Sequence, residues 1–287
     1  MTRYTGTIGR TARDVADAQR VRWRVYGEEE SMISASACVN GREIDAHDGH
    51  RDTIHVIVRA DEEVVGTVRL LLGSAAPPVH ADAAQRRRVG LDLDSRLDLT
   101  ALAAPGVVLA EITRFCVLRA YRGTGVTPAL FAALRAESAR RGITHWVAVA
   151  NTETDVIEDA NLAHQIARAK KLVSPHLDVT PRAPAPPAPR RVRPCYTPDQ
   201  RLRARLAPHA LADLDLPRTL SVFARRMGAR FVGGPYYEPD FGVFALPLVV
   251  ALGDAAAPVC TSTTYPVSPT GTNAARRPPP SPGGGSW

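Results

Sequence analysis

The chain has 287 residues, enough for one large domain or two small ones with a buried core. Apolar residues make up 45% and charged residues 23%, which is typical of a globular protein and excludes a disordered or fibrous one. The 36 basic and 29 acidic residues give a net charge of +7, and only two of the cations are lysines, Lys170 and Lys171. This excess of arginine indicates either a GC-rich coding bias or a surface for acidic partners.

The apolar pattern and the cysteines exclude further classes. No run of 18 apolar residues is present, so no segment is expected to span a membrane. Residues 1–22 lack the apolar stretch of a secretory signal. The cysteines show no metal-ligand spacing and are expected to be reduced thiols: Cys38, Cys116, Cys195 and Cys260. We therefore expect a cytoplasmic protein without a metal site, and the absence of a recognisable reader motif argues against a nucleic-acid partner.

The N-terminal half predicts one helix followed by three strands. Apolar residues at helical spacing predict a helix over 11–26, with Thr11 as its cap. Two runs of β-branched residues, 54–60 and 64–72, flank a short acidic turn and predict a hairpin. Residues 107–118 form the next predicted strand.

The rest of the chain alternates helices and strands. A helix is expected over 128–141, with Thr127 as its N-cap and Gly142 at its end. The remaining predicted elements are a strand at 143–150, helices at 158–172 and 217–227, and strands at 229–233 and 241–252. This order predicts an α/β (α+β) fold with one mixed central sheet flanked by helices and an elaborated C-terminal half.

The chain is expected to form a single folded domain over residues 1–253. Inside it, the Pro-rich basic stretch 181–194 predicts an exposed loop or polyproline linker. Residues 254–287 are expected to form a flexible tail, because 269–287 contains almost nothing apolar to bury.

Two neighbouring features carry the chemistry. The loop from Arg122 to Thr127 lies between a predicted strand and a helix start, where glycines let backbone N–H groups converge on a phosphate; a plain tight turn is the alternative. In the strand before it, alternation places Glu111, Thr113 and Phe115 on one face, with Arg114 on the other unless a bulge intervenes.

The charges in this strand need partners if they are buried. The candidates upstream are Glu43, Asp45, Asp48 and Arg69. Two interpretations stay open. One is a structural network of carboxylates and arginines. The other is a catalytic site in which a carboxylate faces a substrate amine and arginines hold an acidic group.

These motifs resemble a known superfamily. The pattern Arg122-x-x-Gly125-x-Thr127 resembles the acyl-donor loop of GNAT acyltransferases, with Thr in place of the last small residue. Four motifs in order resemble the branch that contains long-chain N-acyl amino acid synthases, ornithine acyltransferases and acyl-homoserine lactone synthases. They are Arg22-Trp23-Arg24-Val25-Tyr26 with Glu29; Glu43, Asp45 and Asp48 with His55; Gly66 to Leu70; and Glu111 to Phe115.

The resemblance covers about residues 15–150 and 215–252. Residues 216–229 and the Pro239-Asp240-Phe241-Gly242 segment are similar to the N-acyl amino acid synthases and ornithine acyltransferases rather than to the lactone synthases. It does not extend over 151–214, where the acceptor site of such enzymes would lie.

The resemblance implies an N-acyltransferase with a GNAT-like fold. It implies a catalytic strand segment at Glu111, Phe115 and Cys116, with Glu111 as the base that accepts the amine proton and backbone N–H groups near Phe115 to Val117 polarising the thioester. Glu111 paired with Arg114 or Arg69 is the structural alternative. A covalent role for Cys116 is disfavoured, because no histidine is near it in sequence.

The resemblance also implies binding sites for two substrates. The donor would be held by Val117, Arg122, Gly123, Thr124, Gly125 and Val126. The acceptor and charge cluster would comprise Arg22, Arg24, Asp45, Asp48, Arg69 and Arg114, with arginines clamping an acceptor carboxylate. No permanently bound cofactor is expected; the co-substrate would be an acyl-phosphopantetheine thioester.

The partners are expected to be an acyl carrier protein or CoA and a small amine, with a peptide as an alternative acceptor. An acidic carrier protein would meet a basic patch, either Arg86 to Arg88 or the set Arg135, Arg140 and Arg141. The implied reaction transfers a medium- or long-chain fatty acyl group to an amino acid or a derivative. The alternatives are a homoserine-lactone-type signal synthase, acylation of a peptide side-chain amine, and a non-catalytic thioester-binding protein.

Overall fold

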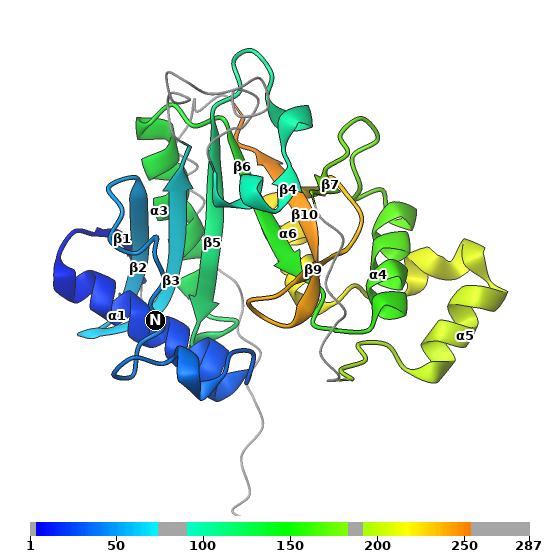
Figure 1. Cartoon of the computed structure of the whole chain (residues 1–287), viewed down its shortest axis with the longest axis horizontal. Coiled ribbons are helices and arrows are strands. Elements are labelled where there is room, and N and C mark those ends of the chain that lie inside the picture. The colour runs from blue at the N-terminus through cyan, green and yellow to red at the C-terminus, as the bar shows by residue number, and fades with distance from the viewer. Residues whose placement is uncertain (1–3, 74–90, 183–191, 254–287) are drawn as a thin grey trace, which may run out of the picture. The chain divides into compact units, whose positions relative to one another are not determined.

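One mixed β-sheet carries the fold (Figure 1). A computed structural model describes residues 4–73, 91–182 and 192–253, which lie in one compact unit, Met1–Ala255. The sheet has eight strands in the order β1-β2-β3-β5-β6-β10-β8, with β9 paired to β10. The strands are β1 Gly6–Gly9, β2 Thr53–Ala60, β3 Glu63–Leu72, β5 Leu109–Val117, β6 His145–Asn151, β8 Arg230–Phe231, β9 Tyr236–Glu238 and β10 Val243–Ala251. A separate two-stranded sheet pairs β4 (Leu97–Asp98) with β7 (Thr180–Pro181).

Helices cover both faces of the sheet. Figure 1 shows α1 in front of the sheet and α3 and α6 behind it. The helices are α1 Ala12–Trp23, α3 Val126–Arg140, α4 Ile157–Ala169, α5 Pro198–Leu206 and α6 Arg218–Met227. This mixed sheet with flanking helices confirms the predicted fold class. No helix in the three described ranges is long and apolar enough to cross a membrane.

Most predicted elements of the N-terminal half are present. Thr11 caps α1 through a capping box with Asp14, and a π-helical turn, Arg24–Glu29, continues the helix three residues beyond the predicted end at residue 26. The β2–β3 hairpin and β5 are also confirmed. The predicted cap of α3 is wrong, because that helix begins at Val126 and its N-cap is Gly125 rather than Thr127.

The sequence analysis misses elements whose residues carry no strong local signal. The strand β1 has the sequence GTIG, and it forms because Gly6 lets α3 approach closely: a Cβ there would meet the Ala129 carbonyl oxygen and the Ala133 side chain. Helix α5 lies in the segment to which the family resemblance does not extend. Residues 183–191 of the Pro-rich stretch, the Arg86 to Arg88 run and the predicted tail lie outside the described residues.

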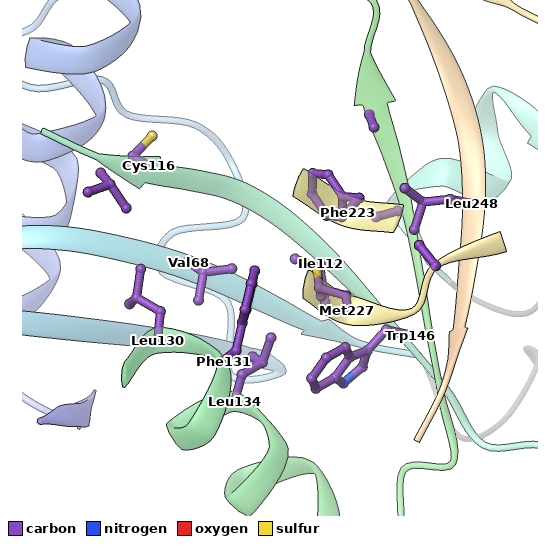
Figure 2. Close-up of a cluster of buried hydrophobic side chains, with 14 of the residues drawn as sticks. Val68, Ile112, Cys116, Leu130, Phe131, Leu134, Trp146, Phe223, Met227 and Leu248 are labelled. Carbon is purple, nitrogen blue, oxygen red and sulfur yellow. The ribbon is translucent and has the colours of Figure 1, made fainter. Parts of the chain in front are cut away.

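The main core includes residues of the sheet, of α1 on one side and of α3 and α6 on the other, and Figure 2 shows part of it. The Phe115 ring stacks on that of Phe131 with centroids 5.3 Å apart, and meets Phe223 edge-on at 6.2 Å. Trp146 is fully buried, and its indole N–H donates to Ser138 Oγ over 2.8 Å. Burial of each such large side chain contributes about 1.5–3 kcal/mol. This core fixes α3 and α6 against β5 and β6, the two strands that carry the site.

The close contact between β1 and α3 predicts that replacing Gly6 by alanine destabilises the protein, whereas the same change at an uncrowded glycine does not. Gly6→Ala should lower the free energy of unfolding by about 1–3 kcal/mol, because the new methyl group meets backbone that has little room to move. Urea denaturation measures this change. Gly49→Ala is the control, since its Cβ would meet nothing within 4 Å, and it should be neutral or slightly stabilising. Equal stability of both variants would contradict this account of β1.

Candidate active site

The two central strands separate at Glu111. Strands β5 and β6 are the parallel pair in the sheet, and their register covers only Leu109–Glu111 against His145–Val147. Beyond this point β5 stays with β3, whereas β6 stays with β10. Figure 1 shows the two strands diverging toward their C-terminal ends. Glu111 is therefore the last paired residue before the strands part.

A bulge in β5 decides which side chains share a face. Arg114 has a left-handed backbone with φ 55°, and the register with β3 shifts between Arg69↔Thr113 and Thr67↔Cys116. The extra residue turns Arg114 to the face that carries Glu111 and Thr113. The predicted placement of Phe115 on that face is wrong, because the bulge turns its ring to the opposite face, against α3 and α6.

Arg114 is held by groups from two other segments. Its guanidinium lies 3.1 Å from Glu43 and 3.1 Å from Asp45, and more loosely, at 3.7 Å, from Asp240. It also lies 5.2 Å from the ring centroid of Phe241. Burial opposes the charge, but the carboxylates outweigh it and raise the pKa of Arg114 above its ordinary value. Arg114 is thus a fixed cation.

Two more buried arginines complete an ion-pair network. Arg22, 1% exposed, lies within 2.6 Å of Asp48 and 2.5 Å of Glu43. Arg69 lies 2.5 Å from Asp45 and 3.0 Å from Asp48. Although burial works against ionisation of Asp48, Arg22 and Arg69 hold its pKa below the ordinary range. The structure therefore brings together every predicted member of the charge cluster except Arg24.

Arg24 lies apart from this network. It forms an ion pair with Glu63, and both side chains are about half exposed. The structural interpretation of the charged residues therefore holds for Arg22, Arg69 and Arg114, whose charges are compensated by carboxylates of the chain itself. None of these three is an unpaired clamp for an acceptor carboxylate.

Glu111 is different, because it is fully buried without a cationic partner at ion-pair distance among the described residues. Its Oε2 accepts a hydrogen bond from the Leu93 N–H over 3.0 Å, while Oε1 has no partner in the described part of the chain. Burial, and to a lesser extent the charge of Asp92, raises the pKa of Glu111 to about 7, against the opposing effect of the Leu93 N–H. A carboxylate with this pKa and a free oxygen is suited to accept a proton near neutral pH.

A second polar cluster beside Glu111 is absent from the sequence-based prediction. Arg96 donates to both carboxylate oxygens of Glu238 over 2.7 Å and lies 2.8 Å from Asp92. The Tyr236 hydroxyl donates to Glu238 Oε2 over 2.7 Å, and His47 lies 3.1 Å from Asp92. These partners are up to 142 residues apart in sequence. Only the alternation that places Tyr236 and Glu238 on one strand face could have indicated part of the cluster.

Cys116 is not poised as a nucleophile. Its side chain is 1% exposed, and burial raises the pKa of the thiol to about 12. The thiol is therefore protonated at neutral pH, which agrees with the expectation that it forms no acyl-enzyme.

The predicted donor loop lies at the start of α3. Gly123 has φ 79°, a conformation that favours glycine. The N-cap of α3, Gly125, has no side chain to cap the helix, and the Val126 N–H has only a long 3.4 Å contact with Thr124 Oγ1. Arg122 donates from Nε to the Val117 carbonyl oxygen over 3.0 Å and lies 2.7 Å from Glu29 and 2.6 Å from Glu30. The arginine charge is therefore compensated by the helical turn that follows α1.

Comparison with known proteins identifies the fold family. Residues 21–132 match the model of the acetyltransferase (GNAT) domain. This part of the chain therefore resembles a GNAT domain. The match bears out the predicted resemblance to GNAT enzymes and the predicted enzyme class, an acyltransferase. The match spans the charge network, Glu111, the bulge and the donor loop. No curated protein sequence matches the chain.

Solved GNAT-like structures resemble the chain at low sequence identity. FeeM, an N-acyl amino acid synthase from uncultured soil microbes, has 12% identity and a TM-score of 0.49 over 88% of this chain and 92% of that one. The CoA-dependent acyl-homoserine lactone synthase BjaI has 16% identity and a TM-score of 0.41 over 84% and 77%. An acyl-CoA N-acyltransferase from Pseudomonas aeruginosa has 15% identity and a TM-score of 0.42 over 87% and 100%.

The raised pKa of Glu111 predicts a pH-dependent effect on stability. The native state keeps the proton between the ordinary pKa of 4.5 and about 7, so ionisation of Glu111 destabilises the fold as the pH rises through this window. Between pH 5 and pH 8, Glu111→Gln should gain about 2–3 kcal/mol in unfolding free energy relative to the wild type.

Chemical denaturation at several pH values measures this difference. Glu137→Gln is the control, because Arg140 holds the pKa of Glu137 at about 2 and its ionisation is complete throughout the window. The difference in unfolding free energy between that variant and the wild type should be the same at every pH. A pH-independent difference for Glu111→Gln as well would contradict the raised pKa of Glu111.

Proposed function

We propose that the chain transfers an acyl group from a phosphopantetheine thioester to an amine and forms an amide. The observation that carries this proposal is Glu111, a buried carboxylate with one free oxygen and a pKa of about 7 at the point where β5 and β6 separate. A GNAT domain supplies the acyl-transfer chemistry, and this carboxylate supplies the base.

Glu111 Oε1 accepts the proton that the attacking nitrogen must lose. The nitrogen lone pair forms a bond to the thioester carbonyl carbon, and the C–S bond breaks. The leaving thiolate takes up the proton that Glu111 received, so that the products are an amide and a free thiol and Glu111 is ionised again. The proton passes to Glu111 directly or through one water molecule.

The backbone of β5 is positioned to polarise the thioester carbonyl. Leu118 N–H donates to the Val65 carbonyl oxygen over 3.0 Å, so this pair is hydrogen-bonded across β3 and β5. Because neighbouring residues of a strand turn their N–H groups to opposite sides, the Val117 N–H faces away from β3, toward the gap beside β6. A donor at this position can stabilise the developing oxyanion.

The loop before α3 supports the binding of the donor phosphate. We propose that Gly123, Thr124, Gly125 and Val126 offer backbone N–H groups, aided by the positive end of the 15-residue helix α3. The Arg122 guanidinium already pairs with Glu29 and Glu30, so the donor phosphate would have to compete with these two carboxylates for it. The donor is proposed to be an acyl-carrier protein or acyl-CoA.

Two further features bear on the donor. A mostly apolar cavity of about 360 Å³ includes Leu109, Leu102 and Val249 in its wall, together with His145 and Arg230. Leu109 shares a strand face with Glu111, two residues farther along β5. This space supports a medium or long acyl chain.

The proposed carrier-protein patch is partly neutralised. Arg140 and Arg141 both pair with Glu137, so this patch carries less net positive charge than the sequence indicates.

Thiol release from acyl-CoAs and acyl-carrier proteins, with a pool of amino acids and other amines, tests the proposal. In the wild type, the amine-dependent kcat/KM, expressed per concentration of neutral amine, should rise about tenfold per pH unit below pH 7 and level off above it, because ionised Glu111 is the base. Glu111→Gln should lower this rate by about 10²–10⁴-fold.

The matched control is Glu62→Gln, which removes an exposed carboxylate from the turn between β2 and β3, outside the site, and should leave the profile unchanged. Full amine-dependent activity of Glu111→Gln would overturn the assignment of the base. Thioester binding without amine-dependent release for any amine or peptide would favour the non-catalytic alternative.

A further inference from the structure

The charges around Glu111 bear on the nature of the acceptor. We infer that the acceptor is an organic cation without a free carboxylate, of the diamine or amino-acid ester class. The inference rests on the proposed function and concerns the substrate of the same site. It departs from an acceptor whose carboxylate is clamped by arginines.

The first observation is the excess of acidic groups. In the described ranges, two ion-pair networks lie near Glu111. One joins four carboxylates with three guanidinium groups, and the other joins two carboxylates with one guanidinium group and also includes His47, 3.1 Å from Asp92. Each network therefore has one carboxylate more than it has guanidinium groups. The carboxylates are Glu43, Asp45, Asp48, Asp92, Glu238 and Asp240, and the guanidinium groups are Arg22, Arg69, Arg96 and Arg114. An anionic acceptor would add to this excess, whereas a cation offsets it.

The second observation is that these guanidinium groups are occupied. Arg96 uses one nitrogen for both oxygens of Glu238 and another for Asp92. Arg69 donates from Nε to the Thr113 hydroxyl. Its Nη1 donates to the carboxylates of Asp45 and Asp48. A substrate carboxylate would have to displace a buried carboxylate of the protein and leave that group without its partner, which costs several kcal/mol.

The third observation is independent of the charge count. Glu111 is fully buried, and its Oε1 is an acceptor without a donor in the parts of the chain that are described. An ammonium group has three donors and no acceptor, so it satisfies this oxygen before it transfers a proton to it. A carboxylate offers only acceptors, so the amine of the acceptor meets Glu111, and an acidic group of the acceptor would have to lie among the surrounding carboxylates.

The remaining negative charge lies where a substrate can meet it. Asp240, on the turn between β9 and β10, has a side chain that is 56% exposed and only a loose 3.7 Å contact with Arg114. Asp92 is 31% exposed and lies beside the groups that surround Glu111. A second cationic group of the acceptor would therefore face acidic side chains at the rim while its amine meets Glu111.

Three amines with the same five-carbon chain and reacting amines of similar basicity test the inference: 1,5-diaminopentane, pentylamine and 5-aminopentanoate. With one thioester donor at pH 7.5 and low salt, kcat/KM for thiol release should fall about tenfold or more at each step in that order. Added salt should reduce the differences in kcat/KM among the three amines, because screening weakens the electrostatic interaction of the acceptor with the exposed carboxylates of Asp92 and Asp240.

The variant Asp240→Asn should reduce the ratio of the diamine to the aminopentanoate rate about threefold or more. Glu62→Gln is the control, because it removes a charge from the exposed turn between β2 and β3, and its ratio should equal that of the wild type. Wild-type rates that are equal for the three amines, or highest for the aminopentanoate, would overturn the inference and leave acyl transfer standing. Thiol release that responds to none of these amines, to no amino acid and to no peptide would overturn the proposed function and this inference with it.

Discussion

The left-handed backbone at Arg114 is the local constraint on which the site depends. A non-glycine residue in this conformation costs about 1–2 kcal/mol. Here the cost is offset by two close carboxylates, Glu43 and Asp45, and by the ring of Phe241. Because β5 gains one residue at this point, Phe115 enters the core and Arg114 joins the face of Glu111. A regular strand would exchange these two side chains and bury the arginine among aromatic rings.

The ion pairs of Arg22, Arg69 and Arg114 hold the segments of the site in place and take no part in proton transfer. Arg22, Arg69 and Arg114 tie α1, the segment 43–48, β3 and β5 together through buried ion pairs. Such pairs add little net stability over a well-packed apolar core, but losing one partner leaves a buried charge and is strongly destabilising. The network therefore fixes geometry, whereas Glu111, which has no such partner among the described residues, keeps a pKa at which it can exchange a proton.

The sequence predicts the features that are local. Helical spacing and the Thr11 cap locate α1, and β-branched runs locate the β2–β3 hairpin. Helix α6 ends at Met227, as predicted, and Gly228 after it is left-handed. Four motifs in the right order along the chain are enough to indicate the GNAT domain, because each of them is a short segment of consecutive or nearly consecutive residues.

The features that the sequence does not reveal depend on long-range packing. The strand β1 forms through a close contact of Gly6 with α3, not through a run of strand-favouring residues. No residue type marks the bulge in β5. The sequence therefore leaves two arrangements open: a regular strand with Phe115 on the face of Glu111, or a bulged strand with Arg114 on that face. The cluster of Arg96, Tyr236 and Glu238 joins segments that only the folded sheet brings together. Likewise, the carboxylate partners that occupy Arg22 and Arg114 become evident only from distances.

The account depends most directly on the protonation of Glu111 in the resting enzyme. The measurement is a ¹³C NMR titration of side-chain carboxyl carbons in the wild type, with the Glu111 signal assigned from its loss in Glu111→Gln. The account predicts a midpoint near pH 7 in the free protein, lowered when pentylamine is bound, since a nearby cation favours the ionised form. A midpoint near the ordinary value of 4.5 would contradict it, because a carboxylate of that basicity at this site would have to be ion-paired or exposed to solvent.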